Sequence, residues 1–310
     1  VRAIFPVHKY DNGFSAGDGH RGIIELGNFG QTGHDSNFTK DCPDVPAVFD
    51  EGDVQFADLN DPRDDYFAEP PTDISGFKDA PVETLVDHGD KFTGGSLEGD
   101  YCQNHGLTQL GEFLIEELIK RGMIVEVDHL PQRSYKRAFE ILEKHDYPAA
   151  GTHGSNYNGK IYELGGVSKF NFGNCVGPNE KPGDRASGLE RRIEMREKAG
   201  AFPAEGFGFD LNGFAGAPGP RFGEDSVCNT PQEDRLEYPF ESYSGDVTFT
   251  EPQLGNRSVD FNTEGLIHIG LIPELIQDVR NTGVTEKDLE PLFKSAEAYL
   301  RMWEKAERRS

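Results

Sequence analysis

The segment from Met123 to Asn156 constrains the fold more than any other stretch, because it reads as strand, helix and strand in succession. Side chains that share one face alternate along both strands. These positions are Val125, Val127 and His129 in the first strand and Ala149, Gly151 and His153 in the second. Between them, apolar residues recur at helical spacing. They are Tyr135, Ala138, Phe139 and Leu142. A strand–helix–strand unit of this length predicts a parallel crossover and therefore an α/β protein.

This crossover places two histidines at neighbouring strand ends. His129 and His153 each follow a strand, and the carboxyl ends of parallel strands carry the active site in α/β barrels. Two imidazoles held together suit a borderline-soft divalent metal such as zinc. Two strand-end histidines without further support are more often ordinary side chains, so the metal-site hypothesis depends on the rest of the chain.

The net charge narrows the range of partners. The chain has 310 residues, with 31 Lys and Arg against 55 Asp and Glu, which gives a formal charge of −24. Such a surface repels phosphate backbones and anionic lipids, so we expect no nucleic-acid partner. No apolar run approaches the roughly 18 residues of a membrane span. A small-molecule substrate fits this chain better, although the charge is equally explained by the solubility of a secreted protein.

The four cysteines, Cys42, Cys102, Cys175 and Cys228, lie far apart and form no C-x-x-C pair. They allow three disulfide pairings. Their even number and the long acidic loops favour an oxidising compartment, so we expect a secreted or periplasmic protein. Free buried thiols are the alternative.

Residues from about 15 to 103 form a long irregular insertion, rich in Gly, Asp, Asn and Pro. Segments of this kind in compact domains are usually lids or binding loops. We expect a cover over the metal face that is held by a Cys42–Cys102 disulfide. Closing a loop of this length stabilises a fold by about 4 kcal/mol in the chain-entropy model.

Further ionisable residues follow other predicted strands. Residues Arg2–His8 read as a strand that ends in His8, and Gly206–Leu211 as a strand that carries Asp210. The chain opens at Val1 inside what reads as a core strand, so we expect that preceding residues are missing. The strand ends together present four groups for one site. They are His8, His129, His153 and Asp210.

The motifs GMIVEVDHLP, PAAGTHGSN and GFGFDLNGFAGAPGPR, in this order, resemble the metal-dependent amidohydrolase superfamily. The branch that they resemble is the membrane (renal) dipeptidase type with its larger bacterial relatives. The opening VRAIFPVHKYDNGF resembles that branch's fourth strand. The resemblance implies a C-terminal portion, strands four to eight, of a (β/α)8 TIM-type barrel. Residues 1–310 would then be a single hydrolase domain, incomplete at its N-terminus and carrying the insertion at about 15–103.

The resemblance also implies roles for individual residues. His129 and His153 match metal ligands, Asp210 matches the aspartate that handles the proton of the attacking water, and His8 matches the histidine that contacts the developing oxyanion. We add two cations, Arg221 and Lys160, as candidate substrate contacts. The expected cofactor is a divalent metal, preferably zinc, as one or two ions. The expected reaction is hydrolysis of a dipeptide-like amide or a related ester or lactone bond by metal-activated water.

The chain departs from the family in two respects. It lacks the H-x-H or H-x-D pair of the first strand and the acidic metal bridge of the third, and two histidines do not complete a tetrahedral zinc site. We therefore expect a missing N-terminal segment or a second polypeptide to supply the remaining ligands. The loop after His153 offers Lys160 where the dipeptidase branch has an arginine, which leaves the substrate open.

Two further hypotheses stay open. The acidic surface and the large insertion are also compatible with a non-catalytic binding or structural extracellular protein on a decayed amidohydrolase scaffold, and a different α/β enzyme is the third reading. Independently of these, Cys175 follows the seventh strand of the implied barrel and Cys228 the eighth. Both cysteines should then lie on one face, which predicts a Cys175–Cys228 disulfide beside Cys42–Cys102.

Overall fold

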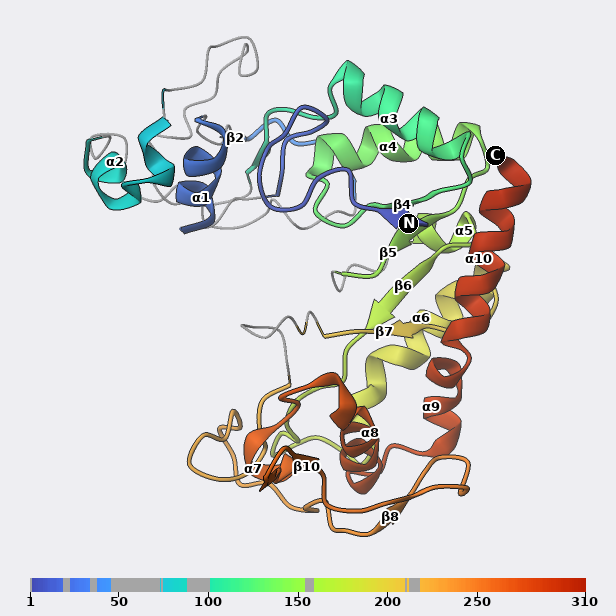
Figure 1. Cartoon of the computed structure of the whole chain (residues 1–310). Coiled ribbons are helices and arrows are strands. Elements are labelled where there is room, and N and C mark those ends of the chain that lie inside the picture. The colour runs from blue at the N-terminus through green and yellow to red at the C-terminus, as the bar shows by residue number, and fades with distance from the viewer. Residues whose placement is uncertain are drawn as a thin grey trace. The chain divides into compact units, whose positions relative to one another are not determined.

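The fold is that of a computed structural model of the whole chain (Figure 1). The structure describes residues 2–18, 23–33, 38–45, 73, 75–87, 101–153, 159–209, 211 and 218–310. The chain divides into two compact units. The first comprises Val1–Gly166 with Arg301–Ser310, and the second comprises Val167–Leu300.

The first unit is built around three parallel strands, β1 (Ala3–Ile4), β4 (Ile124–Glu126) and β5 (Ala149–Gly151). Strand β4 lies between the other two, with Ala3 opposite Ile124 and Val125 opposite Ala149. The parallel crossover predicted from the sequence is therefore confirmed. The predicted strand 2–8 is shorter than expected, since β1 ends well before His8.

Helix α4 (Gln132–Lys144) is the crossover helix between β4 and β5. Its predicted apolar stripe is confirmed, because Tyr135, Ala138, Phe139 and Leu142 are all buried. Helix α3 (Gln109–Ile119) packs beside it (Figure 1). Two parallel hydrogen bonds of 2.9 and 2.8 Å from Arg137 to Glu112 join the exposed sides of these helices. The short helix α5 (Gly159–Glu163) follows β5.

The described part of the insertion is folded. It contains α1 (Ile23–Thr32), a 3-10 turn η2 (Ser75–Lys78), α2 (Pro81–Asp87) and the antiparallel pair β2 (Phe38–Thr39) and β3 (Cys102–Gln103). Phe29, Phe38 and Cys102 are fully buried. The predicted Cys42–Cys102 disulfide is confirmed, and it lies at the end of this strand pair where Thr39 is opposite Cys102.

The second unit contains the parallel pair β6 (Val167–Phe170) and β7 (Gly206–Phe207), joined by helix α6 (Ser187–Lys198). Its remaining elements surround one apolar core. They are α7 (Phe261–Glu264), α8 (Ile272–Asn281), α9 (Glu286–Phe293) and the two-stranded ladders β8–β9 (Phe240–Glu241, Thr248–Phe249) and β10–β11 (Gln253–Leu254, Arg257–Ser258). Short 3-10 turns occupy Asp184–Ala186 and Ile269–Leu271.

The second predicted disulfide, Cys175–Cys228, is also confirmed and belongs to this unit. Its predicted strand 206–211 is shorter than expected and ends at Phe207. The described residues contain parallel strand pairs with connecting helices, so the α/β class holds. No helix among them has the length and apolar character needed to cross a membrane.

The capping-box pattern of Thr285 and Asp288 predicts one C-terminal helix, with an apolar side made of Leu289, Leu292, Phe293, Ala296, Leu300 and Trp303. The chain forms two helices there instead. The capping box between Thr285 and Asp288 starts α9 as predicted. Helix α9 ends at Phe293, and α10 (Ser295–Arg309) begins two residues later. The expected apolar side was wrong for the second of these helices, because Leu300 is exposed whereas Ala298, Met302 and Ala306 are buried.

Candidate metal centre

Three histidines of the first unit meet at the carboxyl ends of its three parallel strands. His8 follows β1, His129 follows β4 and His153 follows β5. The register of the strands brings these chain segments to one edge, because all three run in the same direction. This is the arrangement predicted from the strand-end positions, although the strands themselves stop short of each histidine.

The three imidazole rings are close enough to act together. One ring nitrogen from each lies within 4.8 Å of the other two. The ring centroids are 4.0 Å apart for His8 and His129, 4.2 Å for His129 and His153, and 5.2 Å for His8 and His153. The ring of Phe5 lies about equally far from all three, at 5.8 to 6.0 Å, and gives the cluster an apolar neighbour.

The electrostatics of the cluster favour a neutral imidazole at His8. Partial burial, followed by repulsion from His129 and His153, lowers the pKa of His8 to about 4. A neutral ring has a free lone pair for a metal ion, whereas a protonated one has none. His129 is almost fully buried, His153 is half-buried and His8 is exposed, so the cluster opens to solvent on the side of His8.

Two buried carboxylates hold the segment that carries His153. The backbone N–H of His153 donates to Asp128 at 2.7 Å. The backbone N–H and the hydroxyl of Thr152 donate to Glu126 at 2.8 and 2.6 Å. Burial, followed by the charge of Asp128, raises the pKa of Glu126 to about 8. These contacts fix the chain at the exit of β5, directly before the half-buried imidazole.

A third buried carboxylate contacts His129 itself. Asp18 Oδ2 lies 2.8 Å from His129 Nδ1, and Lys9 Nζ lies 3.3 Å from the same oxygen. Asp18 is not recognisable as a site residue from the sequence, because it lies in the irregular insertion without a motif. Asp128 and Glu126 were also missed. Their signal was present, since both precede His129 on the other face of the same predicted strand.

Two other predicted site residues, Asp210 and Lys160, are not part of the histidine cluster as the structure describes it. Asp210 lies outside the described residues, so its predicted role stays a prediction. Lys160, on α5 of the first unit, pairs with Glu143 of α4 and lies 5.9 Å from the centre of the Phe139 ring. These contacts direct its ammonium group toward α4, which is a structural use of the charge.

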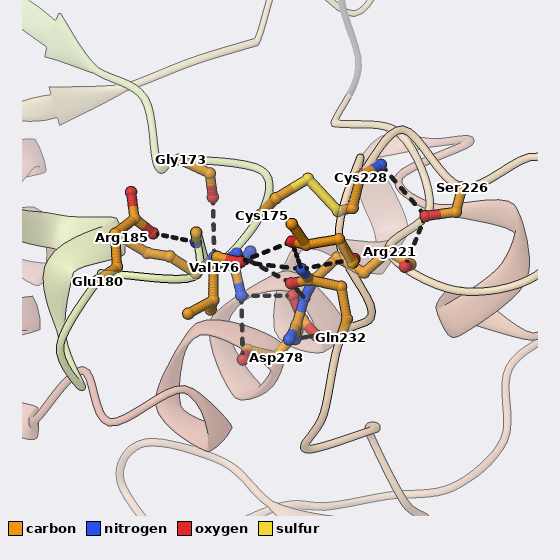
Figure 2. The surroundings of a disulfide bond; sticks show 12 residues. Gly173, Cys175, Val176, Glu180, Arg185, Arg221, Ser226, Cys228, Gln232 and Asp278 are labelled. Carbon is orange, nitrogen blue, oxygen red and sulfur yellow. Dashed lines mark hydrogen bonds and ion pairs between the residues drawn. A yellow bond between two sulfur atoms is a disulfide. The ribbon is translucent and has the colours of Figure 1, made fainter.

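Arg221 is buried in the second unit (Figure 2). Its Nη1 donates to Asp278 at 2.7 Å and its Nη2 to the carbonyl of Glu233 at 2.9 Å. Asp278 also accepts a 2.8 Å hydrogen bond from buried Arg185. The guanidinium is thus a component of an internal ion network near the Cys175–Cys228 disulfide, and this geometry favours a structural role over the predicted substrate contact.

Comparisons of the chain with protein-family models, with curated proteins and with solved structures found no match. The resemblance to amidohydrolases therefore stays an expectation from the motifs, and the function has to be argued from the site.

The donor set fits a zinc-type ion. Among the residues that the structure describes, His8, His129 and His153 are the one cluster of three or more His, Cys, Asp or Glu side chains that could hold a metal. Three neutral imidazoles are a ligand set that zinc accepts, with a fourth position for water or substrate. Sequence reasoning gave His8 a substrate-contacting role, and the geometry also qualifies it as a third ligand.

Proposed function

We propose that this protein is a metal-dependent hydrolase whose metal ion is held by His129 and His153. Its substrate would contain a dipeptide-like amide bond or a related ester or lactone bond. The observation that carries the proposal is the convergence of three imidazole nitrogens within 4.8 Å. A bound divalent ion supplies Lewis acidity and brings the pKa of a water ligand toward about 7. This chemistry needs no nucleophilic side chain.

The chain's own residues support such a reaction in definite ways. Phe5 gives the rings an apolar neighbour, and Asp128 fixes the backbone at His153 through a hydrogen bond from its N–H. His8 is the exposed member and faces solvent, from which a substrate arrives. It either completes the ligand set or donates to the carbonyl oxygen as negative charge develops there, an effect typically worth about 3 to 4 kcal/mol. The proton transfer assigned to Asp210 stays a prediction from the sequence, because Asp210 lies outside the described residues.

The wider context of the proposal follows the family resemblance. The parallel strands would be part of the C-terminal portion of a (β/α)8 barrel. A further segment or polypeptide would complete the metal ligands. A secreted or periplasmic location is supported by the two disulfides, which are typical of oxidising compartments.

Metal analysis of the purified protein tests the proposal. We expect bound zinc by elemental analysis, and its loss in His129→Ala and His153→Ala. His145→Ala is the matched control, because His145 lies in the same unit but outside the cluster and pairs with Glu116. Hydrolysis of dipeptides, esters and lactones should stop with chelator and return with zinc. Protein without metal, or hydrolysis unaffected by chelator, would contradict the proposal.

His8→Ala separates the two roles of His8. Loss of zinc makes it a ligand, whereas retained zinc with a large drop in kcat makes it a substrate contact. A protein that binds zinc but hydrolyses none of these bonds would favour the alternative of a binding protein on a decayed scaffold.

A further inference from the structure

The side chains of Asp18 and His129 form a buried contact between residues that are 111 positions apart. The carboxylate oxygen Oδ2 lies 2.8 Å from Nδ1, and the two side chains are 0% and 1% exposed. Such a contact orders two side chains and removes a carboxylate from water, so it has to be supported by its surroundings. Lys9, at 3.3 Å, places a positive charge beside the same oxygen.

The chemistry of this contact defines the state of the histidine. An ionised carboxylate only accepts hydrogen bonds, so Nδ1 has to carry the proton. In a neutral imidazole the lone pair then lies on Nε2. Metal-binding histidines in proteins usually donate their second ring nitrogen to a carboxylate or carbonyl in this manner.

We propose that Asp18 is a positioning residue, whose contact with Nδ1 turns the His129 ring so that Nε2 is presented to a metal ion shared with His153. The proposal rests on the proposed function, since it assigns the orientation of one ligand of that site. It also gives the insertion, which the family resemblance does not cover, a defined part in the metal centre.

The backbone at His129 supports this role. His129 has a φ of 67°, in the left-handed region that residues other than glycine adopt only where their surroundings hold them. The residue is therefore out of strand alignment, and alternation along β4 does not decide where its ring points. The Asp18 contact supplies a fixed direction instead.

Asp18 is itself held by a buried polar network. The backbone N–H of the preceding residue, Gly17, donates to Asp11 at 2.7 Å, and its carbonyl accepts from the Gln103 side chain at 2.9 Å. Asn28 of helix α1 in turn holds Asp11. Its side-chain oxygen accepts a hydrogen bond of 2.8 Å from the backbone N–H of Asp11. The backbone next to Asp18 is thus held by Asp11 and by contacts from helix α1 and strand β3.

Gly17 shows how closely this loop is packed. A Cβ atom at this position would lie 2.6 Å from the backbone carbonyl oxygen of Lys9, closer than any real contact allows. The loop therefore has little freedom to move Asp18 away from His129. A ligand-orienting group benefits from this restriction, because a misplaced ring loses metal affinity.

The test compares Asp18→Ala and Asp18→Asn in the full chain with Asp41→Asn as control. Asp41 is an acid of the same insertion, but its side chain is 94% exposed. Zinc affinity is measured by competition with a chromophoric chelator. We expect about ten- to hundred-fold weaker binding in Asp18→Ala. Asp18→Asn should lose less, because the amide oxygen still accepts from Nδ1–H. Asp41→Asn should bind as the wild type does.

A second readout is independent of zinc binding. In protein labelled with 15N-histidine, the tautomer of each ring is read from long-range proton–nitrogen correlation spectra, with His129 assigned through His129→Gln. We expect the Nδ1–H form in the metal-free wild type and in Asp18→Asn, and its loss in Asp18→Ala.

The outcomes separate this inference from the proposed function. Zinc affinity within twofold of wild type in Asp18→Ala, with an unchanged His129 signal, overturns the positioning role. A wild type that binds no zinc overturns the proposed function, while the tautomer comparison still decides what Asp18 does to the ring. If Asp18→Ala is unfolded by circular dichroism, Asp18→Leu decides, because leucine has a similar size but no acceptor for Nδ1–H. Weaker zinc binding together with loss of the Nδ1–H form in this variant supports the proposal, and unchanged affinity with an unchanged tautomer contradicts it.

Discussion

Burial decides how a charged residue is used in this molecule, and Arg221 shows this at the scale of a single residue. Its guanidinium shares Asp278 with Arg185 inside the second unit. Removing one partner of a buried ion pair costs about 3–5 kcal/mol, because the remaining charge stays buried. We expect Arg221→Ala to lower the free energy of unfolding toward the lower end of that range, since Arg185 still pairs with Asp278. Denaturant unfolding measures the loss.

The control for this prediction is Arg235→Ala. Arg235 pairs with Asp260 at 3.5 Å, but both side chains are about half-exposed, so the pair contributes at most about 1 kcal/mol. Equal effects of the two substitutions would contradict the structural role of Arg221. Zinc content should be unaffected by either.

Glu126 predicts a dependence of stability on pH. Its folded-state pKa of about 8 lies above the ordinary value of 4.5, because burial and Asp128 oppose its charge. The folded state therefore holds a proton that the unfolded state releases. The stabilising contribution is complete below about pH 4.5 and is lost as pH rises toward 8, at no more than about 1.4 kcal/mol per pH unit.

The substitution Glu126→Gln removes the titrating carboxyl group, whereas the glutamine amide can still form hydrogen bonds with Thr152. We expect a flatter stability profile between pH 5 and 8 than in the wild type, measured by denaturant unfolding at each pH. Glu117→Gln, on the exposed surface of α3, should leave the slope unchanged. The idea fails if the wild type and Glu126→Gln have the same slope.

Single residues also show the limit of sequence reasoning. His8, His129 and His153 could be found because each follows an apolar run at a strand end. Asp18 could not, because its role comes from a tertiary contact across 111 residues and its neighbours have no periodic pattern. Arg221 was assigned to the substrate from its Gly/Pro-rich loop, and only the fold reveals Asp278 beside it.

At the scale of elements, the periodicity of apolar residues predicts the presence of a helix more reliably than it predicts which side of the helix is buried. Helix α4 has apolar residues on one side, and its predicted stripe is buried. For helix α3, the spacing in the sequence predicts an apolar stripe of Leu107, Leu110, Leu114 and Leu118. Of these, Leu118 is buried as expected, but Leu110 is 52% exposed. Ile115, outside that stripe, is fully buried, and Phe113 is 60% exposed.

This difference can be measured on α3. Ile115→Ala should cost about 2–5 kcal/mol, because it leaves a cavity in the packed side of the helix. Leu110→Ala is the matched control on the same helix. It should change the free energy of unfolding by less than about 1 kcal/mol, since half of its surface is already in water. Thermal or denaturant unfolding of both variants is sufficient, and the reverse order would restore the stripe expected from sequence.

At the scale of the whole molecule, each unit carries one disulfide, and only the first unit contains the histidine cluster. The two bridges close loops of similar length, with sequence separations of 60 and 53, so each should stabilise the fold by about 4 kcal/mol in the chain-entropy model. Both pairings were predicted from the sequence. Their consequences for the candidate metal centre differ, because only one of them is linked to a metal-orienting residue.

The link runs through a short chain of contacts. Cys102 and Gln103 form β3, and the Gln103 side chain holds the carbonyl of Gly17, which precedes Asp18. Opening the Cys42–Cys102 bridge loosens one end of β3 and therefore one support of Asp18. We expect the double variant Cys42→Ser/Cys102→Ser to bind zinc more weakly than wild type and to unfold at a lower temperature. Cys175→Ser/Cys228→Ser should show a comparable drop in Tm with unchanged zinc affinity. Equal zinc affinity in both double variants would mean that Asp18 keeps its position without the bridge, and that the buried contacts of Asp11 and Asn28 are sufficient to hold it.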